Sequence, residues 1–92
     1  MTFINRLKGF SLEFTDKATK NLEQLEKQTA RKIDTKLSQL IAGAQGLDIK
    51  RLVDYQEPTY RLRAGDYRII FKIFNDKIVV LVISIIHRKD AY

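Results

Sequence analysis

The chain contains no cysteine and only one histidine. Without cysteine it has no disulfide framework, no thiol chemistry and no cysteine-bound zinc site. A single histidine also leaves too few nitrogen and sulfur ligands for a transition-metal centre. The sequence therefore predicts a fold that needs neither metal nor disulfides, and a function without a metal or another cofactor.

Sequence signatures of several enzyme classes are missing as well. There is no paired-carboxylate signature, no Ser/His/Asp arrangement, no glycine-rich phosphate loop and no HExxH motif. Proteolysis, nucleoside-triphosphate hydrolysis and metal-dependent nuclease chemistry consequently lack their residues in this chain.

Long apolar runs are absent too. The longest stretch, 78–86, is interrupted by Ser84 and is far too short to span a bilayer. The N-terminal segment MTFINRLKGF holds no apolar run long enough for a signal peptide. We therefore expect a cytoplasmic protein without membrane contacts.

What the chain does have is the length of one small domain and an excess of positive charge. Its 92 residues predict a single domain over residues 1–92. Seventeen Lys and Arg residues face eleven Asp and Glu residues, which gives a net charge of +6 and a pI near 9.7. This charge favours an anionic partner such as nucleic acid or an acidic protein, although a soluble basic protein has the same balance.

The N-terminal half predicts one strand and two helices. Residues Phe10 to Phe14 alternate between apolar and polar side chains, as in a half-buried strand. Thr15 is then a suitable N-cap for the first helix. A second helix is predicted from about Thr29. The apolar stripes of the two helices are Ala18, Leu22 and Leu25, and Ile33, Leu37, Leu40, Ile41 and Ala44.

The C-terminal half predicts a connector and three strands. Their ranges are 47–58 for the connector and 59–64, 67–74 and 77–86 for the strands, with turns at Gly65-Asp66 and Asn75-Asp76. The last strand is apolar on both faces, which favours a central strand covered on both sides. The order β-α-α-β-β-β predicts an α+β domain, with the N-terminal strand and a helical hairpin packed on a largely antiparallel sheet.

Arginines cluster on two of these predicted strands. Arg61 and Arg63 are two residues apart and share a face, and Arg68 lies just beyond the turn. Like charges across neighbouring strands are unfavourable, so the cluster needs an anion, nearby carboxylates or full solvation. One interpretation is a phosphate cradle, because guanidinium forks match phosphate oxygens. The alternative is a solvated sheet face with Asp66 and Glu57 as partners.

The only histidine, His87, follows the last predicted strand beside two cationic residues. Histidine suits general acid or base catalysis, but a lone histidine at a strand end is equally compatible with a structural role. We place it in a weaker group of candidate contacts to an anionic partner. This group comprises Lys50, Arg51, Lys72, His87 and Lys89.

The segments YRLRAGDYRIIFKI and VVLVISIIHRKDAY resemble the RelE-type toxins, or mRNA interferases, of the RelE/ParE superfamily. The resemblance extends from the first predicted strand, with Thr15-Asp16-Lys17-Ala18 after it, to Tyr92. It implies the RelE-like fold and a toxin of a type II toxin–antitoxin pair. It further implies metal-independent cleavage of mRNA on the ribosome, by attack of the 2′-OH on the adjacent phosphate. The implied partners are a cognate antitoxin, mRNA with the ribosome and its rRNA, and operator DNA only for the toxin–antitoxin complex.

The resemblance also implies a set of catalytic residues. Arg61 and Arg63 stand where RelE-type nucleases commonly have lysines, and Arg68, Arg88 and Tyr92 match residues of the family. A lysine can lose its proton when its surroundings favour this, whereas an arginine effectively cannot. The identity of the general base is therefore open. Tyr92 is expected either to accept the proton or to stack on a base.

Two other functions remain open from the sequence. One is a ParE-type toxin that inhibits DNA gyrase by binding it. The other is a catalytically weak member that acts through antitoxin and operator binding. The arginines together with Tyr92 favour the nuclease, because a gyrase-binding protein has no evident need for them.

Overall fold

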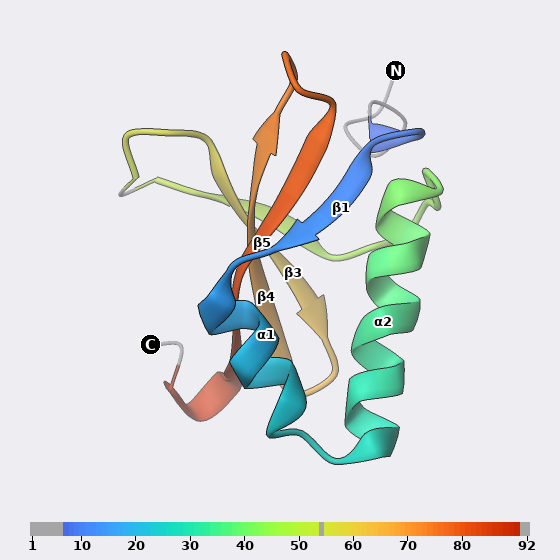
Figure 1. Cartoon of the computed structure of the whole chain (residues 1–92), viewed down its shortest axis with the longest axis vertical. Helices are drawn as coiled ribbons and strands as arrows, with labels where there is room; N and C mark the ends of the chain where they lie inside the picture. The colour runs from blue at the N-terminus through green and yellow to red at the C-terminus, as the bar shows by residue number, and fades with distance from the viewer. Residues whose placement is uncertain (1–6, 54, 91–92) are drawn as a thin grey trace.

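The computed structural model describes residues 7–53 and 55–90, which form two α-helices packed on a five-stranded mixed sheet (Figure 1). The elements in chain order are β1 (Ser11–Phe14), α1 (Asp16–Glu23), α2 (Lys27–Ile41), β2 (Ile49–Leu52), β3 (Thr59–Ala64), β4 (Tyr67–Phe74), β5 (Val79–His87) and the 3₁₀ turn η2 (Arg88–Asp90). The strand order is β1-β5-β4-β3-β2. Only the β1–β5 pair is parallel. The predicted α+β class is confirmed.

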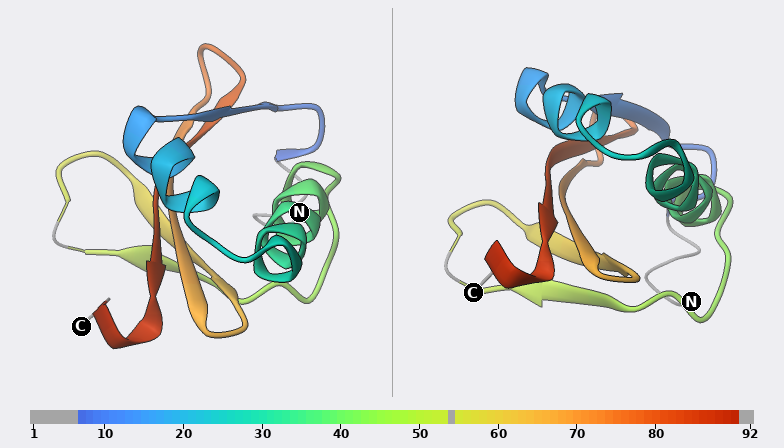
Figure 2. Two further views of the ribbon diagram at one scale, coloured as in Figure 1. Left: turned by 60° about the horizontal axis from the view of Figure 1, so that its bottom comes forward. Right: turned by 90° about the horizontal axis from the view of Figure 1, so that it is seen from below.

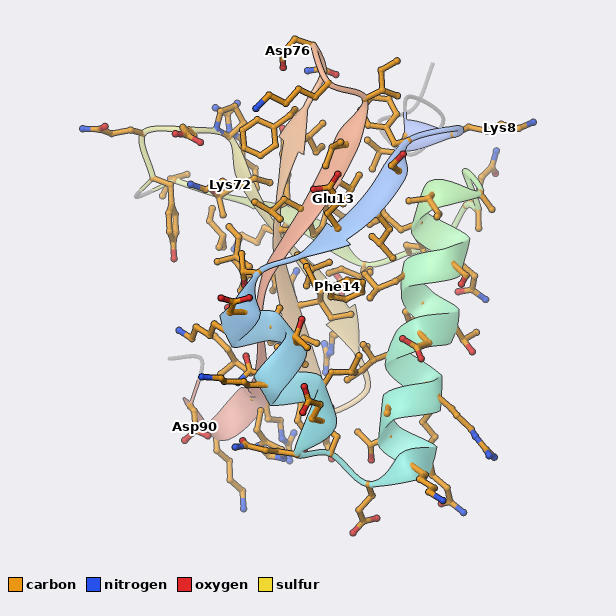
Figure 3. The ribbon with its side chains drawn as sticks, in the orientation of Figure 1. Lys8, Glu13, Phe14, Lys72, Asp76 and Asp90 are labelled. Atoms are coloured by element: carbon orange, nitrogen blue, oxygen red, sulfur yellow. The ribbon has the colours of Figure 1, made fainter. Side chains whose placement is uncertain are left out.

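Both helices cover the same side of the sheet (Figure 2). Side chains of β3 and β4 alternate between the two sides of the sheet, and most of the apolar ones face the helices. Leu62 lies opposite Ile69, for example, and both side chains are fully buried beneath the helices. Ile33 and Leu37 of α2 belong to the same buried cluster. Figure 3 shows Phe14 of β1 on this side as well, between its strand and α2. No described helix covers the opposite side, which we call the open face.

Helix α1 begins where the sequence predicts. Thr15 has extended backbone angles, and its Oγ1 accepts a hydrogen bond from the Ala18 N–H at 3.1 Å. Asp16 lies in the first turn, where a negative charge is favourable beside the free N–H groups. The N-cap prediction is confirmed.

The same cap residue also fastens α1 to the edge of β5. Strand β1 ends at Phe14, so the following part of the β5 edge has no neighbouring strand there. Thr15 Oγ1 donates a hydrogen bond to the Ile83 carbonyl at 2.7 Å, and Asn21 Oδ1 accepts one from the Ile85 N–H at 3.1 Å. Side chains of α1 thus satisfy backbone groups that a strand would otherwise pair, and they fix the helix beside β5.

Strand β5 contains a bulge at this point. Ile70 of β4 lies opposite Ser84, whereas the next residue, Phe71, lies opposite Val82. Ile83 is therefore an extra residue, and the alternation of β5 changes phase across it. Val82 faces the helices with Phe71, while Ser84 faces the open side with Ile70. The prediction of a central strand is confirmed, because β5 lies between β1 and β4. The prediction that both of its faces are covered holds only for the helix side: no described helix lies over the open face, where Ser84 is nevertheless buried beside Ile70.

The segment predicted as a connector contains a strand, which is a second correction. β2 pairs antiparallel with β3, with Ile49 opposite Leu62 and Lys50 opposite Arg61. The strand has four residues, and Lys50 and Arg51 at its centre are exposed. A segment this short carries too little alternation to be recognised without its partner.

Smaller differences concern the ends of elements. α2 begins two residues before the predicted Thr29, with Glu26 as an N-cap residue whose side chain makes no cap hydrogen bond. β3 and β4 have the predicted bounds. The turn after β4 is longer than the predicted Asn75-Asp76, because residues 75–78 form it and β5 begins at Val79.

Ile78 at the end of this turn has a φ of 55° and is half exposed, while its carbonyl accepts a hydrogen bond from the Ser11 N–H at 2.9 Å. A β-branched side chain is strained at this φ, whereas asparagine tolerates it. We therefore expect Ile78→Asn to raise the free energy of unfolding by about 1 kcal/mol, measured by urea denaturation. Lys77→Asn in the same turn is the control and should change little. A less stable Ile78→Asn protein would contradict the account of this turn.

Candidate functional site

A cavity of about 240 Å³ opens on the helix-free side of the sheet. Every β-strand except β1 contributes to its wall, together with the start of α1 and the segment after β2. Its lining residues are Lys17, Leu52, Tyr55, Arg61, Arg68, Ile70, Ile83, Ser84 and Ile86. The walls therefore combine a floor of branched apolar side chains with three cations and one tyrosine.

Arg68 is the most deeply buried charge in the cavity, with 7% of its surface exposed. Its Nη1 donates to the Gly65 and Tyr67 carbonyls, both at 3.1 Å, which holds the guanidinium against the β3–β4 turn. Its Nε is buried without a hydrogen-bond partner, and it forms no ion pair with any described residue. A buried cation without a counter-charge is costly, so this arrangement provides a ready site for an anion.

Arg61 on β3 contributes a second, only partly satisfied guanidinium. Its side chain is 11% exposed, and its Nη2 lies 3.0 Å from Asp48 Oδ1. Its Nε is also buried without a partner. Asp48 is half exposed and is shared with Arg63, whose Nη1 lies 3.9 Å from Asp48 Oδ2. One solvated carboxylate thus faces two guanidinium groups, and the cluster keeps a net positive charge.

The prediction that Arg61 and Arg63 share a face with Arg68 close by is borne out by the strand register, which places all three on the open face. Arg63 lies directly opposite Arg68, and Arg61 lies two residues from Arg63 on the same strand. Arg63 is half exposed and does not line the cavity. Its place is the rim beside the cavity.

Arg88 follows β5 in η2 and lies away from the lining residues. Its Nε is 3.6 Å from Asp66 Oδ1, and its backbone N–H donates to the Asp66 carbonyl at 2.7 Å. Its side chain is 57% exposed, so the Asp66 ion pair is well solvated and weak. Tyr92, the remaining predicted catalytic residue, lies outside the described residues.

The carboxylates that pair with the cations of this face are not the ones that the solvated-face interpretation named. That interpretation assigned Asp66 and Glu57 to the arginine cluster. In the structure Asp48 pairs with Arg61 and Arg63, whereas Asp66 pairs with Arg88. Glu57 pairs instead with Lys72, at 3.3 Å.

A match to a family model decides the relationship of this chain. Residues 12–92 match the model described as the ParE toxin of type II toxin–antitoxin systems, parDE. The chain belongs to the ParE toxin family. It is therefore a type II toxin of the RelE/ParE superfamily, and the resemblance predicted from the sequence is confirmed.

Solved structures similar to this toxin include RelE proteins. The RelBE2 complex of Mycobacterium tuberculosis aligns with a TM-score of 0.72 over 90% of this chain and 95% of the matched chain, at 20% identity. The RelE–RelB complex of Pyrococcus horikoshii gives 0.69 over 89% and 98%, at 21% identity. The isolated Escherichia coli RelE toxin gives 0.68 over 86% and 84%, at 22% identity. At these identities the likeness shows the RelE-like fold. No curated protein sequence matches the chain.

The weaker candidates of the toxin are scattered. Lys50 is exposed on the open face opposite Arg61, and the exposed Arg51 lies opposite Tyr60. Figure 3 shows Lys72 on the part of the sheet remote from α2. Lys89 is exposed in η2.

His87 lies on the helix side of the sheet and not with the arginines. It is opposite Tyr67, and the two rings meet edge to face with centroids 5.1 Å apart. Its Nδ1 accepts a hydrogen bond from the Lys89 N–H at 3.2 Å, which braces the start of η2. These contacts favour the structural interpretation of His87.

Four residues of the site escape sequence reasoning. Asp48 precedes the strand that was read as a connector, and Tyr55 follows it. Lys17 and Ser84 enter the cavity only because α1 lies beside the bulged part of β5. These placements depend on contacts between distant parts of the chain. The one local signal near these residues was the Thr15 cap motif, which predicted the start of α1 but not that α1 lies beside the cavity.

Among the described residues, no helix is long and apolar enough to cross a bilayer.

Proposed function

We propose that this toxin is an endoribonuclease that cleaves mRNA, on the ribosome, by attack of a ribose 2′-OH on the adjacent phosphate. The observation that carries the proposal is that Arg61 and Arg68, both largely buried, line one cavity, and that the buried Nε of each has no hydrogen-bond partner among the described residues. A phosphodiester supplies the missing negative charge and accepts several N–H donors at once.

The reaction needs few components. The 2′-oxygen bonds to phosphorus, the 5′-oxygen departs, and the products are a 2′,3′-cyclic phosphate and a free 5′-OH. In the proposed arrangement Arg61 and Arg68 bind the scissile phosphate and stabilise the charge that develops on its oxygens. Positioning and electrostatic stabilisation supply much of the rate in such a reaction, and fixed guanidinium groups provide both.

The remaining predicted residues have secondary roles in this proposal. Arg63 and Arg88, at the rim and in η2, stabilise charge and guide the RNA backbone. Tyr92 accepts the proton of the 2′-OH or stacks on a base. The exposed cations of the weaker group contribute to RNA attraction through their charge.

Partners follow from the same surface. Solved relatives include RelE toxins in complex with RelB antitoxins, and we propose an acidic antitoxin that covers the arginine-bearing open face. Operator DNA is proposed as a partner of the toxin–antitoxin complex only. The proposed location of the reaction is the cytoplasm, where mRNA and ribosomes are found.

Gyrase inhibition is the second candidate, and the family description favours it, because the matching model is that of ParE toxins. A toxin that acts by covering a protein surface has no need for a buried arginine such as Arg68, which forms no ion pair with any described residue. A toxin that acts only through antitoxin and operator binding is the third candidate, since arginines replace the lysines of RelE-type nucleases.

Expression in bacteria separates these functions. We expect the wild-type toxin to arrest growth and to produce codon-phased mRNA 5′ ends, and we expect Arg88→Ala and Tyr92→Phe each to reduce the cuts at least tenfold, as for loss of a charge-stabilising or proton-transferring group. Lys27→Ala, at the start of α2, is a matched surface control and should remain toxic. Arrest with DNA damage and intact messages would support gyrase inhibition. No arrest would leave antitoxin and operator binding.

A further inference from the structure

Lys17 at the start of α1 extends the site beyond the arginines. Its side chain lines the same cavity as Arg61 and Arg68, although α1 belongs to the layer on the other side of the sheet. It forms no ion pair with any described residue. We propose that Lys17 donates the proton to the departing 5′-oxygen, a role that rests on the RNA cleavage proposed above.

Three hydrogen bonds between α1 and β5 set the position of Lys17. The Thr15 N–H donates to the Val82 carbonyl at 3.0 Å, and Thr15 Oγ1 donates to the Ile83 carbonyl at 2.7 Å. Asn21, one turn further along α1, accepts from the Ile85 N–H. The first turn of α1 is thereby fixed against the bulged segment of β5. Lys17 projects from that turn around the sheet edge to the open face.

The chemistry of the cavity leaves a place for such a group. Cleavage must protonate the leaving oxygen, and arginine cannot supply a proton at neutral pH. Three lining residues carry transferable protons, namely Lys17, Tyr55 and Ser84. Ser84 is a poor donor, because a hydroxyl has no tendency to ionise. Tyr55 is half exposed and supplies no positive charge. Only Lys17 brings a proton together with a positive charge that favours the dianionic transition state.

The step balances as follows. The bond between the 2′-oxygen and phosphorus forms while the bond between phosphorus and the 5′-oxygen breaks, and the electron pair of that bond stays on the 5′-oxygen. The Lys17 ammonium transfers one proton to this oxygen and becomes an amine. The proton of the 2′-OH passes to Tyr92, or to solvent where Tyr92 stacks on a base, and Lys17 is protonated again from solvent.

A substrate with sulfur in place of the 5′-oxygen tests the proposal, because a thiolate leaves without a proton. Ribosomes are programmed with an mRNA that carries the 5′-bridging sulfur at the position the wild-type toxin cuts. On the oxygen substrate, Lys17→Ala should slow cleavage about 100-fold, as expected for loss of a general acid. On the sulfur substrate, the cleavage rate of Lys17→Ala should lie within about threefold of the wild-type rate. Lys17→Arg should cleave the oxygen substrate as slowly as Lys17→Ala, because a guanidinium keeps the positive charge but does not release a proton.

Matched controls make each outcome decisive. Lys20→Ala, on the same helix but outside the cavity lining, should behave as the wild type on both substrates. Tyr55→Phe, which removes the phenolic proton of the cavity lining, should slow cleavage of the oxygen substrate less than Lys17→Ala does. Full activity of Lys17→Arg, or equal slowing of Lys17→Ala on both substrates, would overturn the proton transfer. Unaltered cleavage by Lys17→Ala would remove Lys17 from the site. If the wild-type toxin cleaves neither substrate, the nuclease function fails and this inference with it.

Discussion

Arg68→Met should abolish most RNA cleavage and at the same time leave a more stable protein. Within residues 7–53 and 55–90 the buried guanidinium binds no carboxylate and its Nε has no hydrogen-bond partner, so in the free toxin its charge opposes folding. Methionine fills a similar volume without that charge. We expect kcat to fall by about 10²–10³-fold, as when one donor to a transition-state oxyanion is removed. We also expect the free energy of unfolding to rise by about 1 kcal/mol.

The role of Arg68 in anion binding can also be measured without RNA, through the thermal stability of the toxin in phosphate. Inorganic phosphate should raise the Tm of the wild-type toxin above that in chloride of equal ionic strength, because only the folded state holds the site. The phosphate-dependent increase should disappear in Arg68→Met. Arg31→Met on the exposed side of α2 is the control and should keep both cleavage and the phosphate effect. A marked loss of stability in Arg68→Met, or a full phosphate response, would contradict the anion-site interpretation.

Arg61 should show the second large effect, and the choice of replacement matters. Arg61→Ala removes a guanidinium that is 11% exposed and leaves Asp48 with only its 3.9 Å contact to Arg63. The negative charge then repels phosphate, so we expect kcat/KM to fall at least 100-fold. Arg61→Lys keeps the charge but loses the fork that engages two oxygens. We expect it to lose about tenfold, less than Arg61→Ala.

The difference in kcat/KM between Arg61→Ala and Arg61→Lys shows how much of the effect of Arg61 comes from its guanidinium fork and how much from its charge. Single-turnover cleavage on ribosomes, with substrate concentration varied, separates binding from chemistry. Lys50→Ala is the control, because Lys50 lies directly opposite Arg61 on β2 but is exposed and outside the cavity. It should change kcat/KM by less than about threefold, as expected for a solvated charge. An Arg61→Ala toxin as active as this control would exclude Arg61 from the site.

The sequence predicted those parts of the fold that rest on local patterns. The bounds of β3 and β4 were correct, because alternation and the Gly65-Asp66 turn lie within the segment itself. Thr15 was recognised as a cap for the same reason. β2 was missed because four residues with two exposed cations show no pattern until β3 pairs with them. The bulge at Ile83 was missed because it depends on hydrogen bonds from α1.

The site was predictable to a similar extent. Strand periodicity placed Arg61 and Arg63 on one face with Arg68 close by, and in the structure Arg68 lies directly opposite Arg63. Periodicity could not show that Arg68 is buried without a counter-charge from the described residues while Arg63 is half exposed, because burial depends on how neighbouring strands close around each side chain. Lys17 was read only as part of a helix start, since nothing local indicates that this helix lies at the edge of the cavity.

The chemical nature of the cut ends tests the central claim most directly. Purified toxin is added to ribosomes carrying a defined mRNA, and the end groups of both fragments are determined. We predict a 2′,3′-cyclic phosphate on the upstream fragment and a 5′-OH on the downstream fragment, with both lost in Arg68→Met. Intact mRNA, with inhibition of DNA supercoiling when the same toxin is added to gyrase, would contradict the nuclease and establish the ParE-type function.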